Sequence, residues 1–181
     1  MSDPLWFQTR DELLALLQDT ERQIAALHAL QVRALAAVAV DDDTDESTFF
    51  DPDNDKQYVR EEIAAALHWS AGTTAMRLHE AETLVAQLPL TLRLLGDGRI
   101  SYAHAHTLVD VLDRAGLDHA GALELEHRVL ERAAEQTPAE LRRAARRAAA
   151  AIDPATPNRN TRARWRSGGL RCSRSSMRWR G

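Results

Sequence analysis

Residues 9–40 read TRDELLALLQDTERQIAALHALQVRALAAVAV, and this stretch decides the fold class. It opens on a capping box, in which Thr9 and Glu12 each accept a hydrogen bond from the other residue's backbone N–H. A stripe then recurs at alternating spacings of four and three residues, which is typical of one face of a long helix. Its members are Leu13, Leu17, Thr20, Ile24, Leu27, Gln31, Ala34 and Val38. Two arrangements stay open: this helix packs along a bundle, or it pairs with a copy of itself.

The chain from residue 56 to residue 154 carries the start and stop signals of further, shorter helices. Pro89 and Gly96 bracket one of them, Ser101 and Asp118 are N-caps, and Thr137 begins a second capping box. No segment alternates apolar and polar residues as a half-buried strand would. The sequence therefore predicts an all-α fold, a long N-terminal helix with a compact multi-helix bundle. The shorter helices are expected at about 56–67, 73–88, 89–96, 101–112, 118–134 and 137–153.

Charge divides the chain into segments. Residues 1–154 hold 15 basic and 27 acidic side chains, whereas 155–181 hold eight arginines and no acid. Eight of the acids crowd into residues 41–55, where mutual repulsion and turn-forming residues predict a solvated loop. The expected organisation is a long helix, an acidic linker, a helical bundle and a disordered basic tail. Their ranges are 1–42, 43–55, 56–154 and 155–181.

The tail differs from the rest of the chain in composition, since Arg, Ser, Gly and Trp dominate from about residue 158. Lysine occurs once in the chain against 22 arginines, which suggests GC-rich coding DNA. A slip of reading frame in such DNA yields this composition, so we hypothesise that the ending is frameshifted. The alternative is a genuine basic arm in which Trp165 and Trp179 stack on nucleic-acid bases.

Several classes of protein are disfavoured by the sequence. The longest aliphatic run, residues 34–40, falls far short of the roughly 20 residues that cross a bilayer. The N-terminus lacks the pattern of a secretory signal, and the single cysteine, Cys172, cannot form an internal disulfide. We therefore expect a cytoplasmic protein without membrane contact.

The strongest local motif spans residues 62–78, EIAAALHWSAGTTAMRL, and looks like a helix-turn-helix. On this interpretation Ser70 and Thr73 touch DNA phosphates, while Thr74 and Arg77 approach base edges. Two features oppose it: His68 stands where such turns usually have a left-handed glycine, and the domain is acidic. A plain helical hairpin is the competing interpretation.

Metal and catalytic patterns are weak. Asp51, Asp53, Asp55 and Glu62 have the spacing of a calcium loop, but Lys56 occupies the position that needs glycine. A helix would place His104 and His106 on different sides, and no phosphate loop or nucleophile elbow is present. We expect no catalytic residue, no metal, no cofactor and no small-molecule ligand.

Motifs along residues 10–154 resemble the 13E12 repeat family of actinobacterial proteins, whose N-terminal portion is domain of unknown function 222. The resemblance is carried by LHWS at 67–70, LPLT at 88–91, LGDGRIS at 95–101, TPAEL at 137–141 and AIDP at 151–154. It implies that an HNH endonuclease module, with a histidine base and metal ligands, commonly follows such a domain.

Nothing in this chain matches the catalytic residues of that module, since no histidine follows His127 and no Cys-x-x-Cys occurs. We therefore expect the accessory domain, truncated before its nuclease, with a binding role toward DNA or protein. A fragment of a metal-dependent DNA endonuclease and a coiled-coil dimerisation protein are the alternatives.

Overall fold

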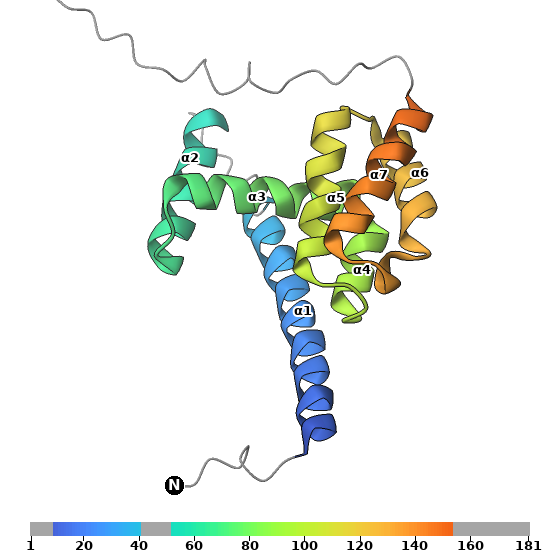
Figure 1. The fold of residues 1–181 in the computed structure, drawn as a ribbon. Coiled ribbons are helices and arrows are strands. Elements are labelled where there is room, and N and C mark those ends of the chain that lie inside the picture. The colour runs from blue at the N-terminus through green and yellow to red at the C-terminus, as the bar shows by residue number, and fades with distance from the viewer. Residues whose placement is uncertain (1–8, 41–51, 154–181) are drawn as a thin grey trace, which may run out of the picture.

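The structure, a computed structural model, describes residues 9–40 and 52–153. Within these ranges the chain forms seven α-helices and one 3-10 helix, with no strand, so the all-α prediction is confirmed (Figure 1). Most of the acidic linker, Asp51 of the calcium-like pattern and the tail with its proposed frameshift lie outside the described residues. The helices are α1 (Arg10–Val40), α2 (Pro52–Leu67), α3 (Ala71–Ala86), α4 (Pro89–Gly96), α5 (Tyr102–Ala115), α6 (His119–Leu130), η3 (Ala133–Glu135) and α7 (Pro138–Ile152).

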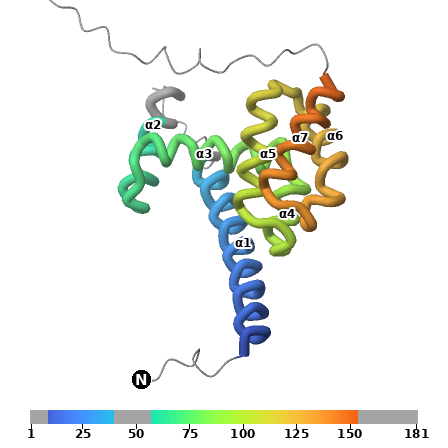
Figure 2. Tube along the Cα trace, viewed as in Figure 1, coloured from blue at the N-terminus to red at the C-terminus, as the bar shows by residue number. Residues whose placement is uncertain are grey.

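Helix α1 belongs to the bundle only along its C-terminal half, and its N-terminal half extends beyond the other helices (Figure 2). The half inside packs against α3 and α4. Most residues that it buries are small or β-branched, which lets neighbouring helices approach closely. These are Ala25, Ala29, Val32 and Ala36, each no more than 8% exposed, and Leu35 is buried beside them. The bundle arrangement foreseen for this helix is therefore present, but on a different face from the stripe that starts at Leu13.

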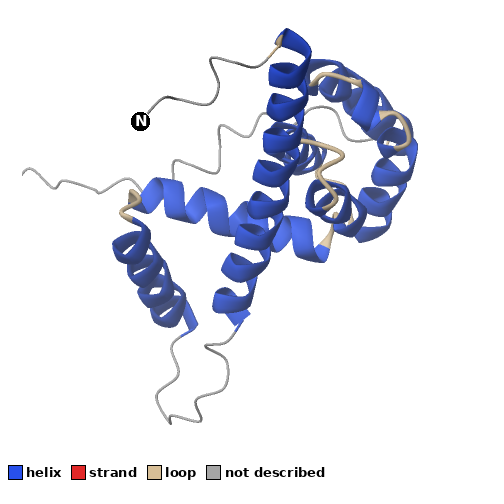
Figure 3. Cartoon of the chain, turned by 90° about the horizontal axis from the view of Figure 1, so that it is seen from below, coloured by secondary structure: helices blue, strands red, loops and turns tan. Residues whose placement is uncertain are grey.

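Helices α2 and α3 form a hairpin, and α3 crosses α1 (Figure 3). Helix α2 begins at Pro52, four residues before the start that we expected, because proline is well tolerated in the first turn of a helix. Val59 and Ile63 are its buried anchors. The last four residues of the predicted acidic linker are therefore helical.

Helices α4 to α7 complete the body, with α7 packed against both α5 and α6. Every one of these helices contributes at least one leucine to the core, and α3 adds Leu78 and Leu84. The sixth helix ends at Leu130 rather than near Ala134, and the chain continues as the 3-10 turn η3. The fully buried leucines are Leu84, Leu88, Leu95, Leu108, Leu125 and Leu141.

The predicted caps are confirmed. Thr9 and Thr137 donate their backbone N–H groups to Glu12 and Glu140 at 2.7 and 2.8 Å, completing both capping boxes. These hydrogen bonds stabilise the charged carboxylates and hold the pKa of each below its usual value. Asp118 accepts from the N–H of Gly121 at 2.8 Å. None of the helices within the described ranges is both long and apolar enough to cross a bilayer.

Candidate functional site

The turn between α2 and α3 has the backbone geometry that we expected of a glycine. His68 adopts φ 53°, in the left-handed region, and is the sole non-glycine residue within the described ranges with a positive φ. Its N–H donates to Ala65 O at 3.4 Å, and the N–H of Trp69 donates to Ala64 O at 2.9 Å. These two bonds make a Schellman motif, which satisfies the last carbonyls of α2. The histidine therefore does not prevent a helix-turn-helix bend.

The four residues proposed to contact DNA lie in different environments. Ser70 is exposed and caps α3, accepting from the N–H of Thr73 at 3.1 Å, and the two hydroxyls are 2.9 Å apart. Thr74 is fully buried, and its hydroxyl donates to the carbonyl oxygen of Ser70. The side chain of Arg77 is 26% exposed and turns toward the interior. Of the four residues, only Ser70 and Thr73 have a polar side-chain group near the surface that is not bonded to a buried group.

Arg77 is part of a polar network around a buried carboxylate. Glu80, on α3, is 3% exposed and accepts a hydrogen bond from the hydroxyl of Tyr102 and one from His106 Nδ1, at 2.5 Å. The guanidinium of Arg77 lies 4.0 Å from the same carboxylate and 4.5 Å from the centre of the Tyr102 ring. A buried charge needs such partners to offset its lost hydration. The network joins α3 to α5.

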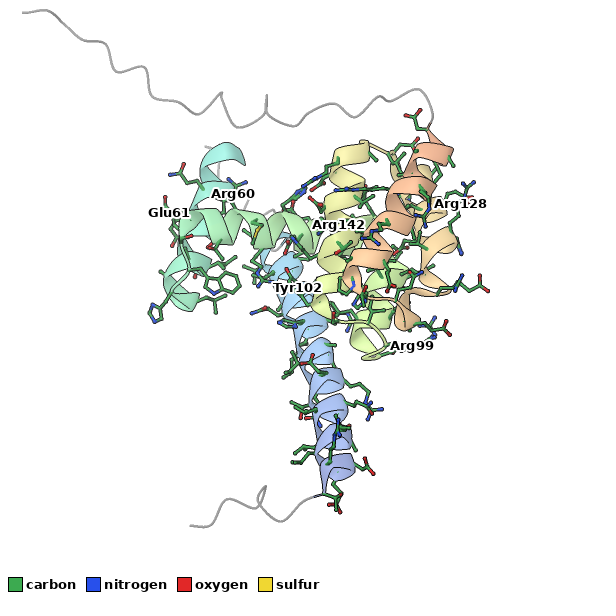
Figure 4. The ribbon with its side chains drawn as sticks, in the orientation of Figure 1. Arg60, Glu61, Arg99, Tyr102, Arg128 and Arg142 are labelled. Carbon is green, nitrogen blue, oxygen red and sulfur yellow. The ribbon has the colours of Figure 1, made fainter. Side chains whose placement is uncertain are left out.

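Helix α1 reaches this network through His28, whose ring lies 4.8 Å from that of Tyr102. Figure 4 labels Tyr102 where α1 and α5 meet. Burial, and then the hydrogen bond to Glu80, raise the pKa of the Tyr102 hydroxyl, because both disfavour a phenolate. His28 Nδ1 and Arg77 Nε are buried without a hydrogen-bond partner. The cluster ties three helices together, and its acidic and basic groups neutralise one another.

Two other histidines also have structural partners. His104 completes the N-terminal cap of α5 with Ser101, and its Nε2 lies 2.8 Å from the carbonyl oxygen of Gln136. His79 Nε2 lies 2.8 Å from Asp113 on α5. His104 and His106 thus meet different partners, as their spacing predicted. Nowhere in residues 9–40 and 52–153 do three side chains of His, Cys, Asp or Glu come together so as to hold a metal ion.

A second buried carboxylate was not foreseen in the sequence. Glu126, on α6, is fully buried and points at the start of α4, whose N-cap residue, Leu88, offers no side-chain acceptor. It accepts from the N–H of Thr91 at 2.8 Å, from the Thr91 hydroxyl at 2.6 Å and from the N–H of Leu90 at 3.3 Å. A negative charge at a helix N-terminus is favoured by the helix dipole. Glu126 thus caps α4 from a neighbouring helix.

Comparison with known families decides the identity of the chain. A family model described as a domain of unknown function (DUF222) matches residues 12–177. The chain belongs to this family. The match includes every helix of the DUF222 domain except the first two residues of α1, and it runs past residue 158, where a frameshift was hypothesised. No curated protein and no solved structure matches the chain.

The DUF222 domain also presents a wide apolar surface, on the part of α1 that the bundle leaves free. Leu17 is 61% exposed, Leu27 65% and Leu30 60%, values high for leucine in a folded helix. All but one of the side chains from residue 10 to residue 24 are exposed, and Leu13 is half-buried. We call this surface the free face of α1. Its large exposed members are Leu14, Leu16, Leu17, Ile24, Leu27, Leu30 and Val38.

Proposed function

We propose that this DUF222 domain is a binding domain and that its first helix pairs with the same helix of a second copy. The observation that carries the proposal is the free face of α1. Contiguous exposed apolar surface of this kind marks interaction sites in folded proteins. The face lies along a helix, and a second helix is the partner that best matches such a shape.

The heptad pattern indicates why the partner is another copy. Positions a and d of the repeat hold the stripe that starts at Leu13, whereas Ala25, Ala29, Val32 and Ala36 occupy positions b and f. Positions b and f face away from a and d, so the bundle uses one side of α1 and leaves the pairing side free. A seven-residue repeat is complementary to itself, because each knob fits a hole between four residues of the facing helix.

The residue types favour a parallel pair. Two of the four a positions are β-branched, Ile24 and Val38, and two of the four d positions are leucine, the combination that prefers two parallel strands, whereas the other positions carry no such preference. Gln31, also at position a, would face its own copy. A polar residue at a single such position selects the aligned register, because any other alignment buries it against apolar side chains.

Measurement of the molar mass in solution tests this proposal. The monomer has a mass of 20.2 kDa, and we expect the full chain to scatter light as a dimer at a concentration of about 100 µM. Leu17→Glu/Leu27→Glu should return it to a monomer with unchanged helical circular dichroism, because both leucines are already exposed. The matched control is Ala15→Glu/Gln18→Glu, which adds the same charge to exposed positions f and b. A monomeric wild type, or a control that also dissociates, would refute the pairing.

The resemblance to the 13E12 repeat family adds a proposed setting, that of an accessory domain for an HNH endonuclease. The described helices do not supply the metal ligands of such a module, so we derive no step of DNA cleavage from them. An assay of plasmid nicking by the purified chain with Mg²⁺ or Mn²⁺ tests the assignment. If nicking activity elutes together with the chain during purification, the alternative is favoured, namely that the chain is a fragment of a metal-dependent DNA endonuclease that keeps its activity.

A second candidate function is DNA contact by the α2–α3 hairpin, and the left-handed turn at His68 favours it. Ser70 and Thr73 would donate their hydroxyls to phosphates. Gly72, in the first turn of α3, is exposed, and a Cβ there would come no closer than 4.0 Å to Ser70 Oγ. Gly72→Glu should therefore keep the fold but repel phosphate, lowering duplex affinity by about tenfold, while Gly72→Ala leaves it unchanged. Equal affinities for the two variants would exclude the hairpin as a DNA surface.

A further inference from the structure

Helix α7 carries four arginines within six residues, and no ion pair within 4.0 Å joins Arg142, Arg143 or Arg147 to an acidic group among the described residues. The four arginines are Arg142, Arg143, Arg146 and Arg147. Glu140, the one acid of this helix, accepts hydrogen bonds from the N–H and hydroxyl of Thr137, and the charge of Arg143 also helps to lower the pKa of its carboxyl. The five arginines that do form ion pairs in the described ranges lie on other helices.

This arrangement is unfavourable for the helix alone. Arg142 and Arg146, like Arg143 and Arg147, are four residues apart, which places like charges side by side on the helix surface. The Nε of Arg142 is also buried without a hydrogen-bond partner. An ordinary solvated face would interleave acids with these arginines, as Glu124 and Arg128 are interleaved on α6. Four arginines against the single acid Glu140 on this helix are better explained by an anionic partner.

Two shallow grooves widen this surface on either side of α7. In one, Arg143 and Arg147 are joined by Arg132, which precedes η3, and the acids Glu135 and Glu140 line the same groove. In the other, Arg146 and Asp153 are joined by Arg114 of α5, which also pairs with Asp110 at 2.8 Å. Arginines from two other parts of the fold therefore flank α7. We call α7 with Arg132 and Arg114 the arginine surface.

We propose that the arginine surface binds the phosphate backbone of double-stranded DNA. Guanidinium groups pair with phosphates through two parallel hydrogen bonds, and an extended row of them fits a repeating anion. The exposed residues of α7 before and after the arginines include alanines, such as Ala139 and Ala150, which allow the helix to approach a backbone closely. A membrane is a poorer partner, because the bulky apolar residues of this helix, Leu141 and Ile152, pack against the bundle and do not project from it. The inference is independent of pairing through α1.

The salt dependence of DNA binding tests the proposal on the full chain. A labelled duplex of about 20 base pairs is titrated at salt concentrations from about 50 to 200 mM. For Arg143→Ala/Arg147→Ala we expect the slope of log affinity against log salt to become shallower by about 1.8, since each lost phosphate contact contributes about 0.9. The unfolding midpoint in urea should stay equal or rise, because like-charge neighbours are removed. A merely structural role would lower it.

The control is Arg33→Ala/Arg99→Ala, which removes the same charge from exposed positions on α1 and in the α4–α5 loop, where Figure 4 labels Arg99. The eight arginines of residues 155–181 are common to both variants, so they cancel from the comparison. Equal losses in the two variants, or no binding by the wild type at about 50 mM salt, would overturn the proposal. Competition by polyglutamate as strong as that by duplex at equal charge would also overturn it, in favour of an acidic protein partner.

Discussion

Replacement of Glu126 by alanine should be among the most damaging single changes in this fold. The carboxylate is fully buried and accepts three hydrogen bonds at the start of α4. Its removal leaves the N–H groups of Leu90 and Thr91 without acceptors, at about 1–3 kcal/mol for each buried group, and opens a cavity. We expect the free energy of unfolding to fall by about 2–5 kcal/mol, from the unsatisfied donors together with the cavity.

The matched control lies two residues away on the same helix. Glu124 is exposed and pairs with Arg128 at 2.7 Å, so Glu124→Ala should cost no more than about 0.5 kcal/mol. Urea unfolding followed by circular dichroism measures both variants. Glu126→Gln should fall between them, because the amide keeps one acceptor for Thr91 but turns a donor toward Leu90. A difference of less than about 1 kcal/mol between the two alanine variants would refute the capping role.

Two further predictions concern Tyr102 and the glycine turns. Tyr102→Phe should cost about 1–3 kcal/mol, because Glu80 loses a donor while buried. Because folding raises the pKa of this tyrosine, its contribution to stability is complete below about pH 10 and declines above it. The free energy of unfolding, measured across that pH range, should show this decline in the wild type and not in Tyr102→Phe. Gly98→Ala should destabilise more than Gly116→Ala: both glycines have positive φ, but a Cβ at Gly98 would meet Arg22 at 2.9 Å, whereas Gly116 has open space. Similar thermal midpoints for the two variants would contradict this close approach.

The helix ends of this protein could be predicted because they are encoded locally. A Thr and a Glu three residues apart satisfy free N–H groups wherever they occur, so the boxes at Thr9 and Thr137 follow from the sequence alone. Pro89 and Gly96 bound α4 as predicted. The predicted start of α2 is four residues too late. Acidic residues and a proline indicate a loop, but proline also suits the first turn of a helix.

The buried carboxylates could not be predicted, because their surroundings come from distant segments. Glu80 lies between His79 and Ala81, with Glu82 next, and looks solvent-facing, yet α3 is contacted by both α1 and α5 and Glu80 is buried. Its partner His106 is 26 residues away, and the Thr91 that Glu126 binds is 35 residues away. A periodic pattern reports which face of a helix is apolar, but it does not report how many neighbours surround that helix.

The free face of α1 is the clearest conflict between pattern and packing. Large apolar side chains contribute most when buried, at roughly 1.5–3 kcal/mol each, whereas alanine contributes little. The bundle nevertheless takes Ala25, Ala29 and Ala36 of α1 and leaves Leu17 and Leu27 in water. Alanine is needed where α3 and α4 approach α1 closely, but nothing in the bundle requires leucine at the exposed positions. The heptad leucines are therefore better understood as the surface for a partner, and mutating them should change assembly while leaving the fold of the monomer intact.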